Sequence, residues 1–242
     1  GSKRNSVTAS QIYDLGAGGI KIGETVIRPA EADRTSRHTI ADNNMHRLGR
    51  VYPSAIGVWV GQSSGNQIVH NHIHDLFYTA ISVGWTWGYG ETLCRGNNID
   101  YNHLHHIGQG MLSDMGAIYT LGIQPGSTIR NNLIHDVYSF TYGGWGIYPD
   151  EGSTSFVIEN NIVYRTKSAG FHQHYGRENT VRNNIFAFGD EFQLMRTRAE
   201  KHLSFTFEGN IVYYDSGALL GSNWSAPEFR MAVPHLLVHD HK

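Results

Sequence analysis

The amino-acid sequence predicts an all-β protein in which one structural coil recurs about eight times. Three observations support this prediction: a repeated corner motif, a strand pattern after each copy of that motif, and a composition rich in glycine, aromatic and β-branched residues. The motif reads apolar residue, two residues, asparagine, one residue, apolar residue. The asparagine position of the motif recurs every 23 to 33 residues, which indicates a constant corner between loops of variable length.

The corner position holds serine in the first copy and asparagine in the later copies. The corner residues are Ser10, Asn43, Asn71, Asn102, Asn132, Asn161, Asn184 and Asn210. We expect each asparagine to adopt the left-handed backbone of a bend while its amide bonds the next corner. Only parallel stacking returns the same residue to the same corner in every turn. The fold class is therefore a right-handed parallel β-helix over residues 1–220, with residues 221–242 as a tail or cap outside the repeat. A leucine-rich repeat fits less well, because no helix period follows the asparagines.

A second strand follows each corner, and its alternation predicts one buried and one outward column. The residues expected in the core are Ile20, Ile81, Ile118, Ile147 and Phe171. The expected outward column is exposed, with about 4.8 Å between coils, and consists of Lys21, Ser82, Tyr119, Tyr148 and His172. The glycine- and aromatic-rich segments 85–90, 108–114 and 139–145 are expected to form walls on one side of this column.

The composition excludes several classes of protein. Apolar residues make up 40% and charged residues 17%, which is typical of a folded globular chain. The formal net charge is -2 without a basic block, so no nucleic-acid partner is expected. No apolar run reaches the roughly 18 residues of a membrane span, so no membrane partner is expected either. Cys94 is the single cysteine, which excludes an intrachain disulfide and a cysteine-based zinc site.

The first residues enter the repeat at once. Gly1 and Ser2 are typical of a cloning scar, and no signal peptide precedes the pattern. A solenoid normally carries a cap at its end. We therefore expect a piece of a longer secreted or periplasmic protein, which is either a monomer or associates end to end through uncapped coils.

The candidate catalytic residues are carboxylates beside the outward column. Glycoside hydrolysis requires two of them, one to protonate the departing oxygen and one to activate water or attack the sugar. Asp114 precedes the strand of Tyr119, whereas Asp150 and Glu151 end the following strand. Along straight strands Asp114 and Asp150 would lie far apart. The glycine-rich loop must therefore fold over the sheet if the two aspartates are to meet.

Rings near these acids suit a sugar ligand, because sugar C–H faces stack on aromatic rings while the hydroxyls bind polar groups. The expected substrate-binding residues are Glu151, Tyr119, Tyr148, His172, His174, Trp145 and Trp85.

A separate column follows the corners by three residues. It comprises His46, His74, His105 and His135, with Tyr13 and Tyr164 at its ends. Imidazoles are good metal ligands, but a residue that repeats once per coil is more simply a stacking ladder. Neither a metal nor a cofactor is therefore expected. The acids Asp75 and Asp136 are expected to bond backbone amides at turns, and Asp190-Glu191 is assigned to a loop.

Three segments of the chain resemble the right-handed β-helix proteins of glycoside hydrolase family 141. They are SDMGAIYTLG (113–122), GGWGIYPDEGS (143–153) and AGFHQHYGRENTVRNNIFAFG (169–189), and the resemblance spans roughly residues 66–189. That family includes enzymes that act on α-L-fucosides of pectin and on xylan. The resemblance implies a polysaccharide or oligosaccharide substrate, and it implies that the family's two catalytic aspartates correspond to Asp114 and Asp150.

The sequence leaves three functions open. The first is a glycoside hydrolase acting on a plant-type polysaccharide. The second is a polysaccharide lyase or epimerase on the same fold, which would use Lys or Arg and often Ca²⁺ to neutralise a uronate; the cations on offer are Lys21, Lys167 and Arg177. The third is a non-catalytic carbohydrate-binding β-helix.

Overall fold

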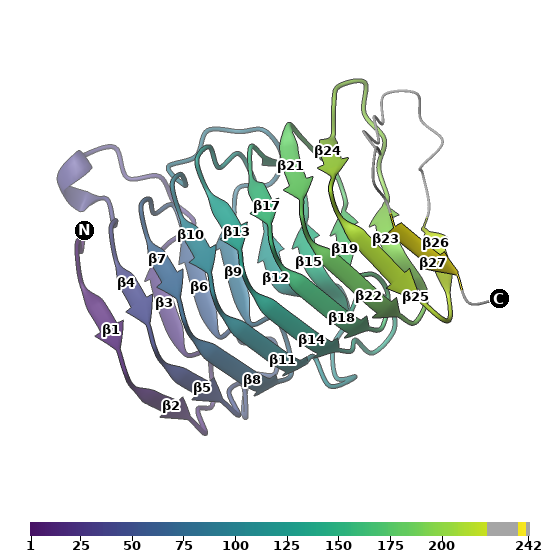
Figure 1. The fold of residues 1–242 in the computed structure, drawn as a ribbon. Helices are drawn as coiled ribbons and strands as arrows, with labels where there is room; N and C mark the ends of the chain where they lie inside the picture. Colours follow the sequence, from purple (N-terminus) through teal and green to yellow (C-terminus); the bar gives the residue numbers. More distant parts are fainter. Residues whose placement is uncertain (222–236, 241–242) are drawn as a thin grey trace.

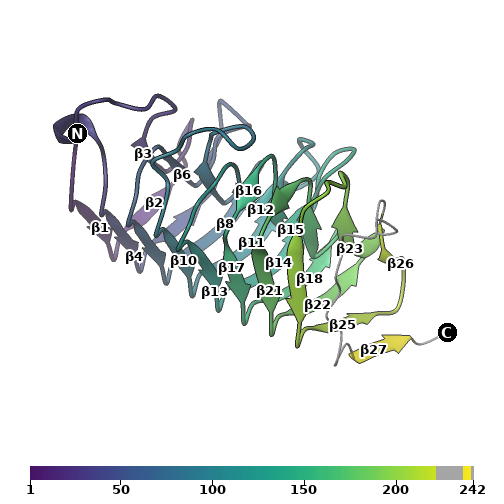
Figure 2. The ribbon, with the colours of Figure 1, turned by 90° about the horizontal axis from the view of Figure 1, so that it is seen from above.

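The computed structural model describes residues 1–221 and 237–240. The described chain is a right-handed parallel β-helix, as the sequence predicts. Its coils stack along one axis, and three parallel sheets run along that axis (Figure 1). Each of eight successive coils contributes one strand to each sheet. Seen from above, the coils follow one another from the N-terminal end of the molecule to its C-terminal end (Figure 2).

The strands fall into three long sheets, named here sheet 1, sheet 2 and sheet 3. Sheet 1 contains β1 (Ser6–Thr8), β4 (Thr39–Ala41), β7 (Gln67–Val69), β10 (Asn98–Asp100), β13 (Thr128–Arg130), β17 (Val157–Glu159), β21 (Asn179–Arg182) and β24 (Phe205–Glu208). Sheet 2 contains β2 (Gln11–Tyr13), β5 (Asn44–His46), β8 (His72–Leu76), β11 (His103–Ile107), β14 (Leu133–Val137), β18 (Ile162–Thr166), β22 (Ile185–Gly189), β25 (Ile211–Tyr214) and β27 (Leu237–Asp240). Sheet 3 contains β3 (Ile20–Gly23), β6 (Val58–Gly61), β9 (Ile81–Gly84), β12 (Gly116–Thr120), β15 (Trp145–Pro149), β19 (Phe171–Gln173), β23 (Phe192–Arg196) and β26 (Ala218–Leu220).

Three short elements complete the described chain. They are the 3-10 turn η1 (Glu31–Asp33) and the paired strands β16 (Ser153–Thr154) and β20 (Gly176–Arg177).

The hydrophobic core fills the space between the three sheets. In sheet 1, Ile99 pairs in register with Ile68 on one side and Ile129 on the other, and all three side chains are fully buried. Identical residues thus stack along the axis, which keeps the packing constant from one coil to the next. The residues expected in the sheet 3 core also lie inside, although Ile20 in the first coil is only partly buried.

The corner between sheets 1 and 2 carries the predicted asparagine ladder. Asn132 is typical: its backbone N–H and its Nδ2 donate to Asn161 Oδ1 at 3.0 and 2.9 Å. The same Nδ2 donates to the carbonyl of Ile99 in the preceding coil at 2.8 Å. These side chains are buried, and the ladder supplies the hydrogen bonds that burial requires. The prediction of a stacked corner is confirmed.

We expected the asparagine of this corner to have the left-handed backbone. In the structure the residue before the asparagine has it. Asp42, His70 and Tyr101, which precede three ladder asparagines, have φ of 59°, 56° and 59°. The ladder asparagine must direct its amide along the helix axis inside the protein. The reversal of the backbone therefore falls on the preceding residue, whose side chain is exposed.

A second buried polar ladder lies at the corner between sheets 3 and 1, and the sequence pattern did not reveal it. Asn66 Nδ2 donates to Asn97 Oδ1 at 2.8 Å, and the backbone N–H of Asn97 donates to Ser127 Oγ at 3.1 Å. Because this corner holds His38, Asn66, Asn97 and Ser127 in successive coils, it has no single residue type that a repeat search could detect.

The outer face of sheet 2 carries the predicted stacking column. Ring centroids of Tyr13, His46, His74, His105, His135 and Tyr164 follow one another at 5.3, 5.0, 4.9, 5.0 and 4.8 Å. The prediction of a stacking ladder is confirmed. The adjoining acids bond these rings instead of backbone amides, since Asp75 Oδ2 lies 2.8 Å from His74 Nδ1 and Asp136 Oδ2 lies 2.6 Å from His135 Nδ1.

The C-terminal segment is described only in part. Of the expected tail at 221–242, residues 222–236 and 241–242 lie outside the described residues, whereas β27 pairs in parallel with β25 and extends sheet 2. Among the described residues, no helix has the length and apolar character needed to cross a membrane. Cys94 is a buried free thiol.

Candidate functional site

The outer face of sheet 3 carries the predicted column of side chains. Strand register aligns Tyr119 with Ser82 on one side and with Tyr148 on the other. The rings of Tyr119 and Tyr148 stack at 4.9 Å, and Tyr148 stacks on His172 at 4.8 Å. Trp59, which the sequence analysis did not place, occupies the position between Lys21 and Ser82.

This column is buried, not exposed as expected. Tyr119 is 6%, Tyr148 4% and His172 2% exposed. Loops cover the sheet at this level, so the rings form the floor of a cavity. The prediction of exposure was wrong because strand alternation distinguishes inward from outward faces, and it carries no information on what covers the outward face.

Two loops from one edge of sheet 3 fold together over this floor. Both connect sheet 2 to sheet 3, and they bond each other where the backbone N–H of Asp114 donates to the carbonyl of Tyr142 at 3.0 Å. The hydroxyl of Tyr78 donates to the carbonyl of Asp114 at 2.8 Å and fixes the same turn. Asp114 itself has a left-handed backbone with φ of 53°.

The segment 85–90 lies on the opposite edge of sheet 3, although all three loops were expected on one side. It follows β9, whereas the other two precede β12 and β15. Its Gly88 N–H faces the carbonyl of Glu151 at 3.4 Å. The loops therefore enclose the column from both edges.

Each candidate aspartate accepts a hydrogen bond from a hydroxyl of the stacked tyrosine pair. The Tyr119 hydroxyl donates to Asp150 Oδ2 at 2.5 Å, and the Tyr148 hydroxyl donates to Asp114 Oδ1 at 3.3 Å. The loop fold that the sequence analysis required for their meeting is present. Asp150 directly follows β15 and is buried.

Burial sets the protonation behaviour of this group of residues. It raises the pKa of the Asp150 carboxyl, although hydrogen bonds from Tyr119 and Tyr148 and the nearby His174 oppose the shift, and Asp114 adds to it. Burial and the charge of Asp150 raise the pKa of both tyrosines, which therefore remain hydrogen-bond donors. A carboxyl group with a raised pKa can hold a proton and deliver it to a ligand.

A cavity of about 390 Å³ opens at these residues. The sequence-predicted residues that line it are Asp114, Trp145, Tyr148, Asp150, Glu151, His172 and His174. Tyr119 does not line the cavity, but its hydroxyl donates to Asp150, which does. Trp85 does not line this cavity; its indole N–H donates to Ser82 Oγ at 3.0 Å, and its ring packs on Trp59 and Trp87.

Several lining residues were missed by the sequence analysis. Glu191, which we had assigned to a loop, and Thr197 both belong to the next coil and face the cavity. Thr197 Oγ1 lies 2.9 Å from His172 Nε2 and 2.6 Å from His174 Nδ1, so it orients both imidazoles. Position in the repeat could have identified Glu191, because it directly precedes β23, the strand that follows β19 in sheet 3.

A cavity of similar size, about 400 Å³, lies over the first two coils and includes Lys21 and Trp59. Within the described part of the chain, no carboxylate lines it. Of these two cavities, the one at Asp114 and Asp150 is therefore the candidate for acid–base chemistry.

Comparison with known proteins places the fold. Residues 1–187 match the family described as right handed beta helix region. A solved structure described as a glycoside hydrolase is similar, with a TM-score of 0.61 and 18% identity over 90% of this chain and 32% of that chain. The chain thus spans about a third of the length of that structure, and at this identity the likeness concerns the fold. A comparison with curated proteins gives no match. Since the family match covers more than half of the residues, the chain belongs to the right handed beta helix family.

Proposed function

We propose that this β-helix is the substrate-cleaving part of a glycoside hydrolase that acts on a plant-type polysaccharide of the xylan or fucosylated-pectin class. The observation that carries the proposal is the placement of Asp114 and Asp150 at one cavity, joined through the stacked Tyr119–Tyr148 pair. The likeness to a structure described as a glycoside hydrolase, and the resemblance of three segments to family 141, support the same class of reaction.

Asp150 is the proposed general acid. Its burial raises its pKa, so the carboxyl holds a proton at a higher pH than an exposed aspartate would. The Tyr119 hydroxyl fixes the orientation of the group. In this role Asp150 protonates the glycosidic oxygen as the bond to the sugar breaks.

Asp114 is the proposed second carboxylate. It lies on the loop that folds over the column, and its side chain accepts a hydrogen bond from Tyr148. As a carboxylate it can activate a water molecule or attack the anomeric carbon. Product stereochemistry distinguishes these two possibilities.

The remaining walls suit an uncharged sugar. Trp145 packs against Tyr148 and His172 with ring centroids at 4.3 and 4.2 Å, which gives an aromatic surface beside the acids. Glu151, Glu191 and His174 add polar groups for hydroxyls. Among the described residues, no Lys or Arg lines this cavity.

This lining does not favour the lyase or epimerase alternative, because that chemistry requires neutralisation of a uronate. The two nearest candidates are engaged elsewhere. Lys167 Nζ donates to backbone carbonyls, including that of Phe140 at 3.2 Å, and Arg177 lies over the ring of Tyr89 at 4.8 Å.

The test is hydrolysis of a panel of xylans and fucosylated pectic oligosaccharides by the wild-type chain and two variants. We expect Asp150→Asn and Asp114→Asn each to lower kcat by about 10²–10⁴-fold, the usual range for loss of an acid–base group. Asp42→Asn is the matched control, since Asp42 is an exposed corner residue whose left-handed backbone asparagine tolerates.

Full activity in either cavity variant would refute the assignment of that aspartate. An unsaturated product that absorbs in the ultraviolet would move the reaction to the lyase class. Sugar binding by calorimetry without turnover of any substrate would reduce the proposal to a carbohydrate-binding β-helix.

A further inference from the structure

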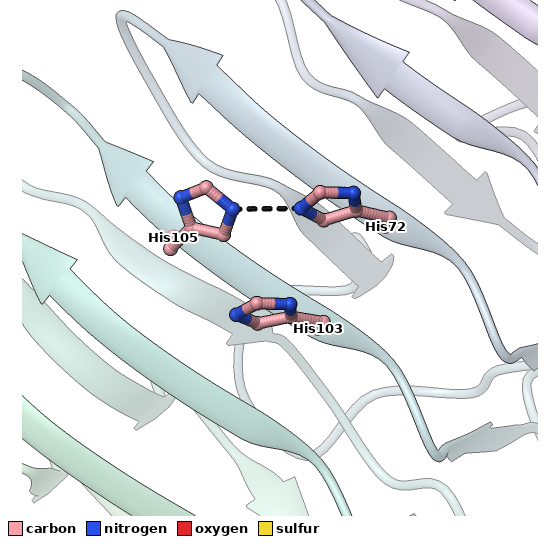
Figure 3. A group of neighbouring side chains, drawn as sticks. All are labelled: His72, His103 and His105. Atoms are coloured by element: carbon pink, nitrogen blue, oxygen red, sulfur yellow. Dashed lines mark hydrogen bonds between the residues drawn. The ribbon is translucent and has the colours of Figure 1, made fainter.

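A cluster of imidazoles on sheet 2 is separate from the cavity on sheet 3. His72 belongs to β8, and His103 and His105 belong to the adjacent strand β11. One ring nitrogen from each of the three lies within 4.8 Å of the others (Figure 3). From this geometry we infer that His72, His103 and His105 form a binding site for a divalent transition-metal ion of the Zn²⁺ type.

The three nitrogens come together because two columns of rings run side by side. His103 and His105 alternate with Leu104, so both point outward from the same strand, and His72 stacks on His103 at 4.9 Å. His72 Nε2 and His105 Nε2 face each other across the two columns at 2.7 Å. The stacking ladder recognised in the sequence contains only His105 of this trio. The site arises where that ladder meets its neighbour.

The facing nitrogens form a hydrogen bond, and their separation is also close to the one that a metal ion requires. A tetrahedral Zn²⁺ with Zn–N bonds of about 2.0–2.1 Å separates its ligand nitrogens by about 3.3–3.4 Å. The His72–His105 contact therefore needs to open by only about 0.6 Å, which rotation of two half-buried rings can supply. Three imidazole ligands leave one position for water or a fourth ligand. His135 Nε2 lies 2.9 Å from His103 Nε2.

A neighbouring histidine beside this trio has a fixed ring orientation. His135 Nδ1 bonds Asp136 Oδ2 at 2.6 Å, the kind of carboxylate contact that orients a histidine beside a metal.

The ion class follows from the donors. Among the described residues, the group consists of three imidazole nitrogens. Such donors suit Zn²⁺, Cu²⁺ or Ni²⁺, and they do not suit Ca²⁺ or Mg²⁺, which prefer oxygen. A bound ion would join two successive coils, because β8 and β11 belong to the third and fourth coils. The site would therefore fasten neighbouring coils on the face of the helix that does not carry the cavity.

The decisive variant is His105→Phe. Phenylalanine keeps a flat ring between His74 and His135 but removes both nitrogens, so it separates coordination from stacking. We would titrate the chain with Zn²⁺ by calorimetry in a non-chelating buffer, and with Co²⁺ by visible absorption. The wild-type chain should bind one ion per molecule, and His105→Phe should weaken this binding at least 100-fold.

The matched control is His46→Phe, the same exchange in the same column between Tyr13 and His74. It should bind Zn²⁺ within about twofold of wild type. A thermal-unfolding midpoint that rises with Zn²⁺ in the wild type and in His46→Phe, but not in His105→Phe, would support the site independently. His72→Phe repeats the test on β8 if His105→Phe does not fold.

Three results would overturn the inference. The first is the absence of Zn²⁺ and Co²⁺ binding to the folded wild-type chain. The second is undiminished binding by both His105→Phe and His72→Phe. The third is an equal loss in His46→Phe, which would indicate general adsorption to surface histidines.

Discussion

The outer faces of sheets 2 and 3 carry columns of rings with nearly the same spacing, yet they form different surfaces. On sheet 2, His105 stacks between His74 and His135 at 4.9 and 5.0 Å, and the rings are half-buried. On sheet 3, Tyr148 stacks between Tyr119 and His172 at 4.9 and 4.8 Å, but these rings are buried. The coil geometry therefore sets the stacking on both faces. The loops decide which column becomes the floor of an acidic cavity.

Among the variants that test this comparison, the largest expected effect comes from displacing the loop that covers sheet 3. Gly143 has φ of 103°, and a Cβ there would meet the backbone N atoms of Met115 and Asp114 at 2.9 and 3.0 Å. Gly143→Ala should push the Asp114 loop away and lower hydrolysis about 10²-fold, because misplacement by about 1 Å can have that effect. Steady-state kinetics on the best substrate of the wild-type chain provides the measurement.

Gly96→Ala is the control for this change. Gly96 also has a left-handed backbone, with φ of 58°, but a Cβ there meets nothing within 4 Å. Its activity should match that of the wild type. Equal losses in both variants would mean that backbone strain, and not contact between the loops, explains the result.

The next effect concerns the asparagine corner between sheets 1 and 2. Asn132→Ala removes the bonds to Asn161 and Ile99 and leaves buried partners unsatisfied. We expect the free energy of unfolding to fall by about 2–3 kcal/mol. Asn98→Ala, which removes half-buried contacts to Gln67 and Thr128, should change it by less than about 0.5 kcal/mol. Urea denaturation compares the two, and similar small losses would show that the ladder contributes little.

A smaller effect is the pH dependence of the free energy of unfolding that arises from the histidines on sheet 2. The folded pKa values of His103 and His105, about 4 and about 3, are below the ordinary value of 6.5. A depressed pKa gives stability that is complete above the unfolded value and is lost as the pH falls toward the folded value. Between pH 7.5 and 5, in the presence of a chelator, we expect a loss on the order of 1 kcal/mol per ring after allowance for solvent screening.

His105→Phe should reduce this pH dependence, and His70→Phe, an exposed ring outside the cluster, should not. Unfolding curves at the two pH values provide the measurement. An unchanged slope in His105→Phe would remove the link between stacked imidazoles and acid sensitivity.

The smallest effect is a shift in the pKa of Asp150 in the cavity on sheet 3. The Tyr119 hydroxyl stabilises the charged form of Asp150 and so opposes the rise in its pKa. Tyr119→Phe should raise that pKa further. Because the proposed acid works when protonated, the basic limb of the kcat/KM profile should move to higher pH. Tyr175→Phe, which removes a bond to Glu151 instead, should leave the limb in place. A downward shift in Tyr119→Phe would contradict the role of Asp150 as acid.

The features that the sequence predicted are those that repeat. The corner asparagines, the coil count and the column from Tyr13 to Tyr164 depend on one residue type that returns in register. The features that it did not predict depend on contacts that occur once. Glu191 reaches the cavity from a different coil, and the burial of Tyr148 depends on loops whose paths are set by contacts such as that between Asp114 and Tyr142.

The acid pair lies between these two cases. Asp114 and Asp150 were identifiable by residue type, and their approach was conditional on a loop fold that no periodic pattern specifies. His72 and His103 show the same limit on sheet 2. Stacking within a column follows from the repeat, whereas contact across columns depends on ring orientations that only the folded chain defines.

The one-strand-per-coil arrangement makes the size of the cavity change in whole steps. Asp114 precedes β12, Asp150 follows β15, and His174 and Thr197 follow β19 and β23, so four successive coils build the walls. Since a coil contacts mainly its neighbours, excision of an early coil should shorten the molecule while sparing the pocket. Duplication of one of the four would instead lengthen the pocket by a single strand spacing, about 4.8 Å. A solenoid of this kind offers protein engineers a cavity whose length is adjustable in fixed increments.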